Sequence, residues 1–281
     1  MDQYVVAGHP VEHSQSPFIH AEFARATGQA LAYGRLLCPR DGFAATIRHF
    51  AQACTAGPAR GCNVTMPFKF EAFALCARAT PRAALARAAN TLRFDAQGWL
   101  CDNTDGAGLI ADIELGAGVP LAGQRLLVLG AGGAAAGLLG PLLAARPAQL
   151  VLANRSVDKA DELVQRHLSV TGACELRAAP LDDCGVGFGI VINATASSLQ
   201  AAGVPVSAHV LRAGALALDL AYGDDAAPFL EWAAANDAFG RDGLGMLVEQ
   251  AAESFEFWRG VRPETAPVLA ALRKRFAKPQ P

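Results

Sequence analysis

The sequence predicts an α/β protein of two domains, a smaller α/β domain and a larger one built on a doubly wound sheet. Two observations lead to this fold class. Strand-like and helix-like segments alternate through residues 1–80, and the apolar strand 125–129 runs directly into a glycine-rich turn and a helix. With 281 residues, of which 52% are hydrophobic and 18% charged, each domain can bury a core of its own.

The composition argues for a small-molecule partner. The formal net charge is −2, and the chain has no basic stripe and no long run of like charges, so neither nucleic acid nor an anionic membrane is expected to bind. The seven cysteines form no C-x-x-C pair and no cluster with histidine, which indicates free thiols in a reducing cytoplasm and no metal site. The N-terminus lacks the pattern of a signal peptide, and every apolar run is broken before about 18 residues. We therefore expect a cytoplasmic protein.

The first strand, 4–8, leads into a polar loop. Pro17 then opens a helix that runs to about Thr27, with Gly28 as its stop, and this places Ser16 at the N-cap. Ser14 lies two residues back on the same side. Ser16 is either a helix cap or, together with Ser14, one of two hydroxyls that hold a polyol or a carboxylate. The histidines at 9, 13 and 20 lack a ligand spacing and are expected on the loop and the helix surface.

Lys69 occupies an unusual position in the next unit of the pattern. Strands are expected at 31–37 and 61–66, with a helix at 42–54 between them, and the second strand stops at Pro67, where another helix begins. Lys69 then falls in the first helical turn, where a cation faces the positive end of the helix dipole at a cost of roughly 0.3–1 kcal/mol. Such violations of local rules concentrate at functional sites. The alternative is a solvated surface lysine.

A hairpin predicts which polar residues are neighbours. After a helical piece at 82–89, the segments 91–94 and 99–101 form two strands joined by a turn containing Gly98. The feet of this hairpin are Asn90 and the run Asp102-Asn103-Thr104-Asp105, which should therefore lie together. Asp105 also precedes a helical pattern, 107–115, so a plain N-cap is the alternative for it.

The strongest single motif is Gly130-Ala131-Gly132-Gly133-Ala134-Ala135. It stands between the buried strand 125–129 and a helix that runs to about Leu143, the context of a Rossmann-type G-x-G-x-x-A fingerprint. Gly130 permits the tight turn, Gly132 removes a side chain where a pyrophosphate approaches, and the helix N-terminus offers N–H donors. The alternative is a tight packing turn of small residues.

The end of the second strand of this domain, 150–153, distinguishes between two dinucleotides. An NAD-binding unit carries an acidic residue there, whereas this chain has Asn154-Arg155-Ser156, followed by Lys159. A guanidinium, a hydroxyl and an ammonium suit the dianionic 2′-phosphate of NADP. We therefore expect NADP, with a surface role for Arg155 as the alternative.

Strands at 175–178, 189–193 and 215–219 complete the doubly wound sheet. Thr195, Leu220 and Tyr222 follow the carboxyl ends of two of these strands, where ligands bind in such folds. The last helix opens after Asp242-Gly243 with an apolar stripe at positions 244, 247, 248, 251, 255 and 258. Gln250 lies above Met246 on the edge of this stripe.

At this point the sequence resembles the shikimate dehydrogenase family along most of its length. The matching motifs, in order, are Ser14-Gln15-Ser16-Pro17, Asn63 to Lys69, Ala89-Asn90-Thr91-Leu92, Asp102 to Gly106, Gly130 to Ala134, Asn154-Arg155-Ser156, Asn193-Ala194-Thr195 and Asp242 to Met246. The resemblance implies an oxidoreductase that reversibly reduces 3-dehydroshikimate to shikimate with NADPH, in the pathway to chorismate and the aromatic amino acids. It also implies a substrate domain, 1–105 plus 243–281, interrupted by an NADP domain, 106–242.

The resemblance implies a role for each candidate residue. Lys69 and Asp105 are the polar pair at the reacting centre. The substrate is held by Ser14, Ser16, Thr65, Asn90, Tyr222 and Gln250. The cofactor is held by Gly130, Ala131, Gly132, Gly133, Ala134, Asn154, Arg155, Ser156, Lys159, Thr195, Leu220, Gly243 and Met246.

The chain also departs from the family pattern. Arg87 stands where the family usually has glycine, Ala89 where it has valine, and Ser198-Leu199 where it has a Gly-Met pair. A relative acting on quinate or a modified analogue, and a non-catalytic NADP(H) sensor, are the other readings. The enzyme is expected to be a monomer or a homodimer.

Overall fold

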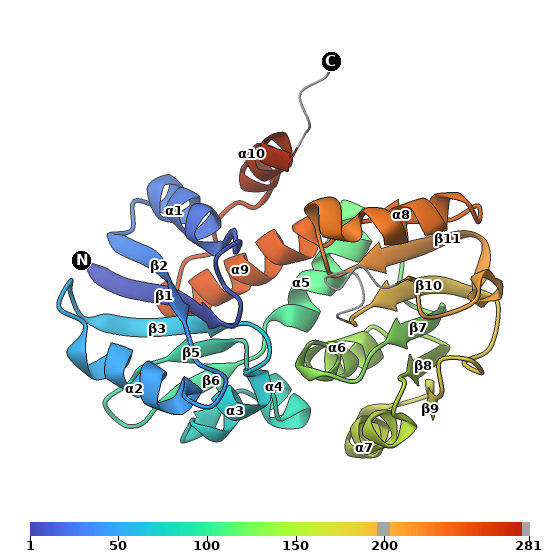
Figure 1. Ribbon diagram of the computed structural model, residues 1–281, viewed down its shortest axis with the longest axis horizontal. Coiled ribbons are helices and arrows are strands. Elements are labelled where there is room, and N and C mark those ends of the chain that lie inside the picture. The colour runs from blue at the N-terminus through green and yellow to red at the C-terminus, as the bar shows by residue number, and fades with distance from the viewer. Residues whose placement is uncertain (196–202, 277–281) are drawn as a thin grey trace. The chain divides into compact units, whose positions relative to one another are not determined.

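The computed structural model describes residues 1–195 and 203–276, and the chain forms two compact units (Figure 1). The first unit consists of Met1–Gly108 and the chain from Val248 onward, and the second is Leu109–Leu247. Both borders fall inside helices, α5 (Asp105–Ala111) and α9 (Leu244–Arg259), a few residues beyond the borders expected from the sequence. Among the described residues no helix is both long and apolar enough to cross a membrane.

The first unit is built on a mixed six-stranded sheet. Its strand order is β2-β1-β3-β5-β6-β4. The first three strands pair in parallel, as the alternation of strands and helices predicted, and β5 and β6 form the predicted antiparallel hairpin. The elements are β1 (Asp2–Gly8), α1 (Ser16–Thr27), β2 (Leu31–Leu37), α2 (Phe43–Ala53), β3 (Ala59–Val64), α3 (Lys69–Ala74), β4 (Arg78–Ala79), α4 (Pro81–Ala86), β5 (Thr91–Arg93), β6 (Leu100–Asp102), α9 and α10 (Ala266–Phe276). The two-residue β4 and the helix α10 were not anticipated.

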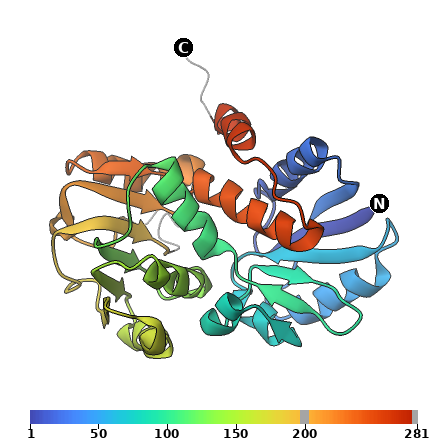
Figure 2. The same ribbon diagram turned by 180° about the vertical axis from the view of Figure 1, so that it is seen from behind.

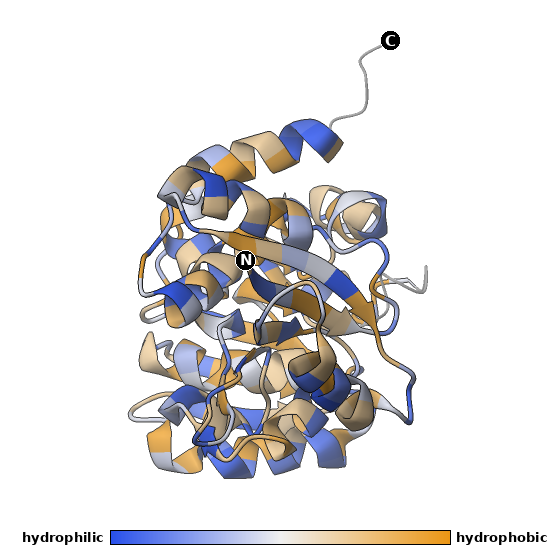
Figure 3. Ribbon diagram, turned by 90° about the vertical axis from the view of Figure 1, so that its left-hand side faces the viewer, coloured by the Kyte–Doolittle hydropathy of each residue, from blue (hydrophilic) through white to orange (hydrophobic). Residues whose placement is uncertain are grey.

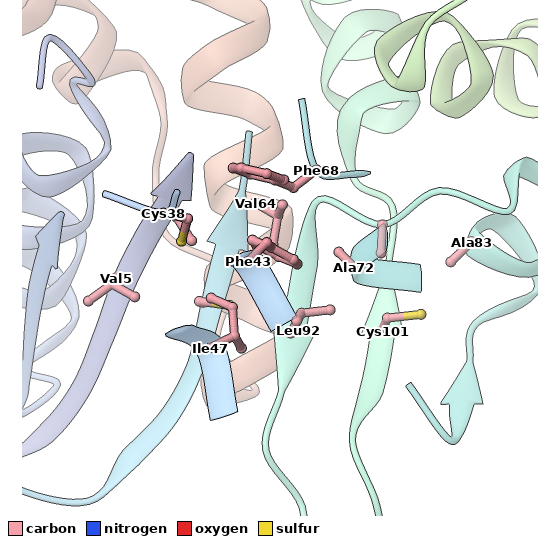
Figure 4. Packing of buried hydrophobic residues seen from close by; sticks show 13 residues of the cluster. Val5, Cys38, Phe43, Ile47, Val64, Phe68, Ala72, Ala83, Leu92 and Cys101 are labelled. Atoms are coloured by element: carbon pink, nitrogen blue, oxygen red, sulfur yellow. The ribbon is translucent and has the colours of Figure 1, made fainter. Parts of the chain in front are cut away.

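The two faces of this sheet differ in chemistry because side chains alternate along each strand. On β3, Cys62 and Val64 belong to an apolar core formed with α2 and α3, and Figure 4 shows Val64 within it. Phe43 and Phe68 stack at the centre of that core with ring centroids 4.6 Å apart. Asn63, between Cys62 and Val64, points to the opposite face, where it bonds Ser254 on α9. One strand thus contributes both to the core and to a buried polar layer.

That second face also carries an aromatic cluster, and His20 lies within it. The prediction of a surface position for His20 is wrong, because its ring is fully buried and stacks on Tyr33 with centroids 4.2 Å apart. Phe255 and Trp258 of α9 pack around the same ring. Neither ring nitrogen has a hydrogen-bond partner among the described residues, and burial lowers the pKa of His20 to about 3. The histidine is therefore held neutral by its surroundings.

Two local expectations at helix starts need correction. Ser16 is not the cap of α1: it is the first helical residue, and the N-cap is Gln15, whose side chain makes no capping bond. The Ser14 hydroxyl instead accepts the Ser16 amide at 3.3 Å. β3 ends at Val64 rather than Met66, and α3 begins at Lys69 rather than Pro67, because Phe68 N–H bonds to the Thr65 carbonyl and closes a turn. Lys69 still lies in the first helical turn, as predicted.

The predicted helix at 82–89 ends early, at Arg87. α4 covers Pro81–Ala86, and Arg87 adopts the left-handed conformation, with φ of 49°. This conformation brings Cβ close to the following carbonyl oxygen in any residue except glycine. The backbone conformation at position 87 therefore favours glycine, the residue that the family usually has there, over the arginine of this chain.

Helices of the first unit mix apolar and polar residues, as expected of helices with one exposed face. In Figure 3 hydrophilic residues gather near the end of α10, where Arg273, Lys274 and Arg275 follow one another. Arg275 lies over the ring of Phe18 on α1, with its guanidinium carbon 4.4 Å from the ring centroid. α10 is thereby attached to α1.

The second unit has the predicted doubly wound sheet. Six strands, all parallel, are ordered β12-β11-β10-β7-β8-β9, so the chain starts in the middle, winds outward one way and then the other. The elements are η1 (Asp112–Gly116, a π turn that continues α5), β7 (Arg125–Leu129), α6 (Gly133–Ala144), β8 (Gln149–Ala153), α7 (Val157–His167), η2 (Leu168–Val170), β9 (Glu175–Ala179), β10 (Phe188–Asn193), η4 (Ala208–Val210), β11 (Leu211–Asp219), η5 (Gly223–Ala226), α8 (Ala227–Ala234) and β12 (Phe239–Arg241).

Helices cover both faces of this sheet. α6 and α7 lie on one face and α8 on the other, as the two opposite views show (Figures 1 and 2). Phe229 and Ala233 of α8 close an apolar cluster with residues of β7, β8, β10 and β11. The short edge strand β12 was not anticipated, and β11 begins at Leu211, four residues before the expected start. The central strands, which are apolar and buried, were found correctly.

The neutral His20 makes stability depend on pH. The unfolded chain takes up a proton on this residue below a pKa of about 6.5, and the folded chain does so only near 3, so this contribution is complete above pH 6.5 and is lost as the pH falls. Between pH 7.5 and pH 5 the loss amounts to about 2 kcal/mol. His20→Phe cannot take up this proton. Between pH 7.5 and pH 5 its free energy of unfolding, measured with urea, should therefore fall by about 2 kcal/mol less than that of the wild type. The exposed His49→Gln should behave as the wild type, and an unchanged pH dependence in His20→Phe would contradict a buried neutral histidine.

Arg87→Gly should stabilise the protein. Removing Cβ from a left-handed residue relieves about 1–2 kcal/mol, partly offset by the greater freedom of glycine in the unfolded chain, which leaves a gain of about 0.5–1 kcal/mol. The matched control is Arg48→Gly in the interior of α2, which should lose about 1 kcal/mol. Urea unfolding of both variants tests this, and equal losses would show that position 87 has no preference for glycine.

Candidate active site

An ion pair between Lys69 and Asp105 lies at the centre of the candidate site. Lys69 Nζ donates to Asp105 Oδ2 at 2.5 Å, and the side chains are only 14% and 5% exposed. Lys69 is the first residue of α3 and Asp105 the first residue of α5. The carboxylate provides the negative charge that compensates an ammonium at a helix N-terminus.

Asn90 connects this pair to the neighbouring residues, as the hairpin predicted. Its Nδ2 lies 2.9 Å from Asp105 Oδ1, 2.8 Å from Thr104 Oγ1 and 3.1 Å from Gln250 Oε1. Its Oδ1 accepts Thr104 N–H at 2.8 Å and the Thr91 hydroxyl at 3.0 Å. Asn90 is 2% exposed, so all these contacts are made away from water. The amide therefore fixes the second oxygen of Asp105 while Lys69 binds the first.

The loop that carries Asp105 is pinned by its own side chains. Asn103 Oδ1 accepts the Asp105 amide at 3.2 Å, and Asn103 Nδ2 donates to the Ala88 carbonyl at 2.9 Å. Asp102 forms a bidentate pair with Arg82, with distances of 2.7 and 2.6 Å. Burial raises the pKa of Asp102, but the bonds from Arg82, Thr80 and the Asn103 amide outweigh it and hold that pKa below its usual value. A charged, well-bonded carboxylate thus anchors the start of the loop.

A close approach of two helices brings Gln250 to this group. At Gly108 of α5 an added Cβ would lie 2.5 Å from the backbone nitrogen of Gln250 and 2.6 Å from its Cβ. Only glycine allows α5 and α9 to pack this closely at that point. The side chain of Gln250 consequently reaches Asn90 and Thr104.

The two serines form a second part of the site. Ser14 Oγ donates to Ser16 Oγ at 3.2 Å, so the hydroxyls do lie on the same side. Tyr33 on β2 donates its hydroxyl to Asn63 Oδ1 at 2.7 Å. Asn63 Nδ2 in turn lies 3.2 Å from the Asn90 carbonyl. Hydrogen bonds therefore run from Tyr33 through Asn63 and Thr91 to the side chain of Asn90, which bonds Asp105.

The remaining predicted substrate residues lie as follows. Thr65 stands in the turn between β3 and α3, half-buried against Gly8, where an added Cβ would lie 2.2 Å from Thr65 Cγ2. Tyr222 belongs to the second unit and precedes η5. Hydrogen bonds thus connect six of the predicted residues in two groups, one of Lys69, Asp105, Asn90 and Gln250 and the other of Ser14 and Ser16.

The glycine motif has the form that a dinucleotide requires. Gly130 has φ of 103°, and an added Cβ would lie 2.9 Å from the Ala194 carbonyl oxygen, so the turn demands glycine. At Gly132 an added Cβ would meet nothing within 4 Å, which leaves open space directly before α6. Ala131, Gly133 and Ala134 complete the turn and the first helical residues. The open space at a helix N-terminus fits a pyrophosphate.

The loop after β8 is cationic. Arg155, Ser156 and Lys159 are exposed, and Asn154 is half-buried with its Nδ2 bonded to the Ser156 carbonyl at 2.8 Å. The acidic residue nearest to the end of β8, Asp158, is already inside the first turn of α7. The donors present fit a 2′-phosphate better than a ribose 2′-hydroxyl.

The other predicted cofactor residues cluster at the carboxyl ends of β10 and β11. Asn193 Nδ2 donates to Asp219 Oδ2 at 3.0 Å and ties the two strand ends together. Asn193 Oδ1 accepts the hydroxyl of Thr195 at 2.7 Å. Gly243 packs against Leu220, where an added Cβ would lie 2.3 Å from the carbonyl oxygen, and Met246 is buried nearby on α9. The departure at Ser198-Leu199 lies outside the described residues.

The sequence analysis did not single out the buried polar residues that hydrogen-bond to the predicted site residues or to their neighbours. They are Tyr33, Asn63, Arg82, Thr91, Asn103, Thr104, Asn193, Asp219 and Ser254. Several of them sit inside the quoted motifs, and Ser254 follows Gln250 by four residues on the same helix face. That spacing was the available signal. No group of metal-ligating side chains occurs in the part of the chain that the structure describes.

Comparison with known proteins finds matches to shikimate dehydrogenases along most of the chain. Three family models match: the shikimate dehydrogenase substrate binding domain at residues 6–92, shikimate / quinate 5-dehydrogenase at 112–228, and the shikimate 5′-dehydrogenase C-terminal domain at 243–273. Shikimate dehydrogenase (NADP(+)) of Methylibium petroleiphilum is 67% identical over 97% of this chain and 94% of its own length. The enzyme of the same name from an Acidovorax species is 54% identical over 98% and 97%.

Solved structures agree with these matches. An Ael1 enzyme from Pseudomonas putida is 44% identical, with a TM-score of 0.85 and 99% coverage of both chains. A shikimate 5-dehydrogenase from Thermus thermophilus, solved in complex with NADP(H) and shikimate, is 29% identical, with a TM-score of 0.82 and coverage of 98% and 99%. The chain belongs to the shikimate dehydrogenase family.

Proposed function

We propose that this protein is an NADP-dependent shikimate dehydrogenase, which reversibly reduces 3-dehydroshikimate to shikimate in the pathway to chorismate and the aromatic amino acids. The observation that supports it best is the bonded group of Lys69, Asp105, Asn90 and Gln250, in a chain 67% identical to an enzyme of that name. We assign substrate binding to the first unit and cofactor binding to the second.

The substrate is a ring with a carboxylate, hydroxyls and one ketone. Ser14 and Ser16 are hydroxyl donors for the carboxylate, with Thr65 and Tyr222 as further hydroxyl donors. Asp105 accepts a hydrogen bond from the hydroxyl next to the reacting carbon. Asn90 and Gln250 hold the polar groups in place. Each assignment uses a donor or acceptor that the ring presents.

Lys69 supplies the proton of the reaction. Reduction adds a hydride to the ketone carbon and leaves negative charge on the oxygen, which must take up a proton to become the hydroxyl. The Lys69 ammonium provides a positive charge and a transferable proton for that oxygen, and such catalysis is typically worth roughly 10²–10⁴-fold. Asp105 keeps the ammonium in a fixed direction through the 2.5 Å bond.

NADPH, when bound, supplies the hydride. The chain's own part is to hold the pyrophosphate on Gly130 to Ala134 at the start of α6, and the adenosine 2′-phosphate on Asn154, Arg155, Ser156 and Lys159. Thr195, Leu220, Gly243 and Met246 line the nicotinamide end. The space before α6 and the cationic loop after β8 support this assignment.

Two other functions predict different results in the same assay. A quinate enzyme would turn over quinate with a higher kcat/KM than shikimate, and a sensor would bind NADP(H) without turning over either compound. We expect NADPH to form with shikimate and a kcat/KM for quinate at least tenfold lower. The free thiols of the cysteines support a cytoplasmic location. We propose that the enzyme acts as a monomer or a homodimer.

Lys69→Ala should lose most of kcat, by about 10²-fold or more, because the proton donor is gone, while shikimate affinity stays within about tenfold. Steady-state rates and calorimetric titration with shikimate measure the two quantities. The exposed Lys274→Ala on α10 is the control and should keep full activity. Near-normal turnover of Lys69→Ala would end the assignment.

Arg155→Ala should weaken NADP⁺ by about 10- to 100-fold and leave NAD⁺ within about twofold, because only NADP⁺ carries the 2′-phosphate. Cofactor titrations of the two dinucleotides measure the ratio. Arg212→Ala removes the same charge from the opposite, amino edge of the same sheet and should change neither affinity. Equal losses for both dinucleotides in Arg155→Ala would show that Arg155 does not read the 2′-phosphate.

A further inference from the structure

Arg35 is a positive charge beside the two serines, and the proposed reaction has given it no role. It lies on β2, and its Nη2 donates to the carbonyl oxygen of Ser14 at 2.6 Å. The hydroxyl of Ser14 bonds the hydroxyl of Ser16. Because the carbonyl and the hydroxyl of Ser14 belong to one residue, the guanidinium lies close to both. A cation is therefore part of the same cluster as the serines.

The sheet places Arg35 on the face that carries the buried polar layer. Side chains alternate along a strand, so Arg35 points to the same side as Tyr33, whose hydroxyl bonds Asn63. In the parallel register Arg35 is opposite Val6, and Val6 is opposite Asn63. Arg35 also lies near the carboxyl end of β2, and the loop with the serines follows the carboxyl end of β1. Ligands bind at such strand ends in parallel sheets.

Arg35 has no acidic partner within the part of the chain that the structure describes. Its bond to Ser14 is its only hydrogen bond there, and no carboxylate forms an ion pair with it. Other arginines of the first unit, such as Arg25 and Arg60, pair with a glutamate or an aspartate. A guanidinium has several N–H groups, and the bond to the carbonyl uses one of them. The others are available to an anion that arrives from solvent, since the side chain is exposed.

We propose that Arg35 supplies the positive charge that binds the carboxylate of shikimate, next to the hydroxyls of Ser14 and Ser16. The inference rests on the proposed function, which names shikimate as the ligand. Serine hydroxyls are neutral donors, whereas a guanidinium forms the stronger, charge-assisted bonds to a carboxylate. The Ser14 carbonyl holds the guanidinium in place, so little further freedom is lost when the ligand binds.

A simpler role must be separated from this one. Arg35 could act only as a support that holds the loop of the serines through the Ser14 carbonyl. Loss of such a support would weaken every ligand of the loop to the same degree, whether the ligand is charged or neutral. The test therefore needs a readout that responds to the charge of the ligand and to the charge at position 35.

The experiment compares shikimate with its uncharged methyl ester in the wild type and in Arg35→Ala. The affinity of the ester is measured as a KM if it is oxidised and as an inhibition constant against shikimate if it is not. We expect Arg35→Ala to raise the KM for shikimate about 5- to 20-fold, because one charge-assisted interaction is lost. The affinity for the ester and the KM for NADP⁺ should stay within about twofold, since neither involves this carboxylate.

Two further variants test the charge with shikimate alone. Arg35→Lys keeps the charge and should hold the KM within about threefold of the wild type. Arg35→Glu reverses the charge and should raise the KM at least about threefold beyond that of Arg35→Ala, because like charges repel. The matched control is Arg48→Ala, which removes the same charge from α2 on the other face of the sheet and should change no constant.

Three results would each overturn the proposal. They are an unchanged KM for shikimate in Arg35→Ala, equal losses of affinity for shikimate and its ester, and equal KM values for shikimate in Arg35→Ala and Arg35→Glu. The last two would identify Arg35 as a support for the loop. Failure of the wild type to oxidise shikimate would instead overturn the proposed function.

Discussion

The hydrogen bonds of Asn90 are the constraint on which the candidate site depends. This amide joins the loop that carries Asp105, the helix that carries Gln250 and, through Asp105, the Lys69 ammonium. A buried Lys–Asp pair is expensive to desolvate, and it persists where further bonds satisfy the carboxylate. Asn90 and Lys69 together supply one partner to each oxygen of Asp105. These bonds keep the Lys69–Asp105 ion pair in one orientation, and all of the residues involved belong to the first unit.

The sheet of the first unit makes such a buried polar layer possible. Its strands alternate between an apolar face covered by α2 and α3 and a face that carries Asn63 and Thr91 under α9. Among the described residues, the buried side-chain polar atoms without a partner belong only to His20 and His167. Hydrogen bonds are stronger in a buried setting of low dielectric constant than in water. A buried polar layer in which nearly every group is bonded is therefore rigid. In the second unit, the residues that we assign to the cofactor stand at strand ends and at the start of a helix.

The two units, the central strands and the glycine turn could be predicted from the sequence. The signals for them, which are the periodicity of apolar residues, buried apolar runs and the spacing of glycines, are all local. The same holds for the neighbours at the hairpin feet, Asn90 and Asp105. The buried His20 could not be predicted, because its helix position is decided by Tyr33, Phe255 and Trp258, which come from distant parts of the chain. The prediction of a cap at Ser16 was wrong because Ser16 is itself the first helical residue, and Ser14, two residues earlier, accepts its amide. The burial of Ser254 and its bonds to Asn63 and Thr91 depend on the packing of α9 on the sheet, which no local pattern indicates.

We propose that this network preforms the substrate site within the first unit. Calorimetric titration of the wild-type protein with shikimate, in the complete absence of NADP⁺ and NADPH, tests this proposal. We expect saturable binding with one site per chain, abolished or strongly weakened in Asn90→Ala. Binding that appears only after cofactor is added, or that survives unchanged in Asn90→Ala, would contradict it.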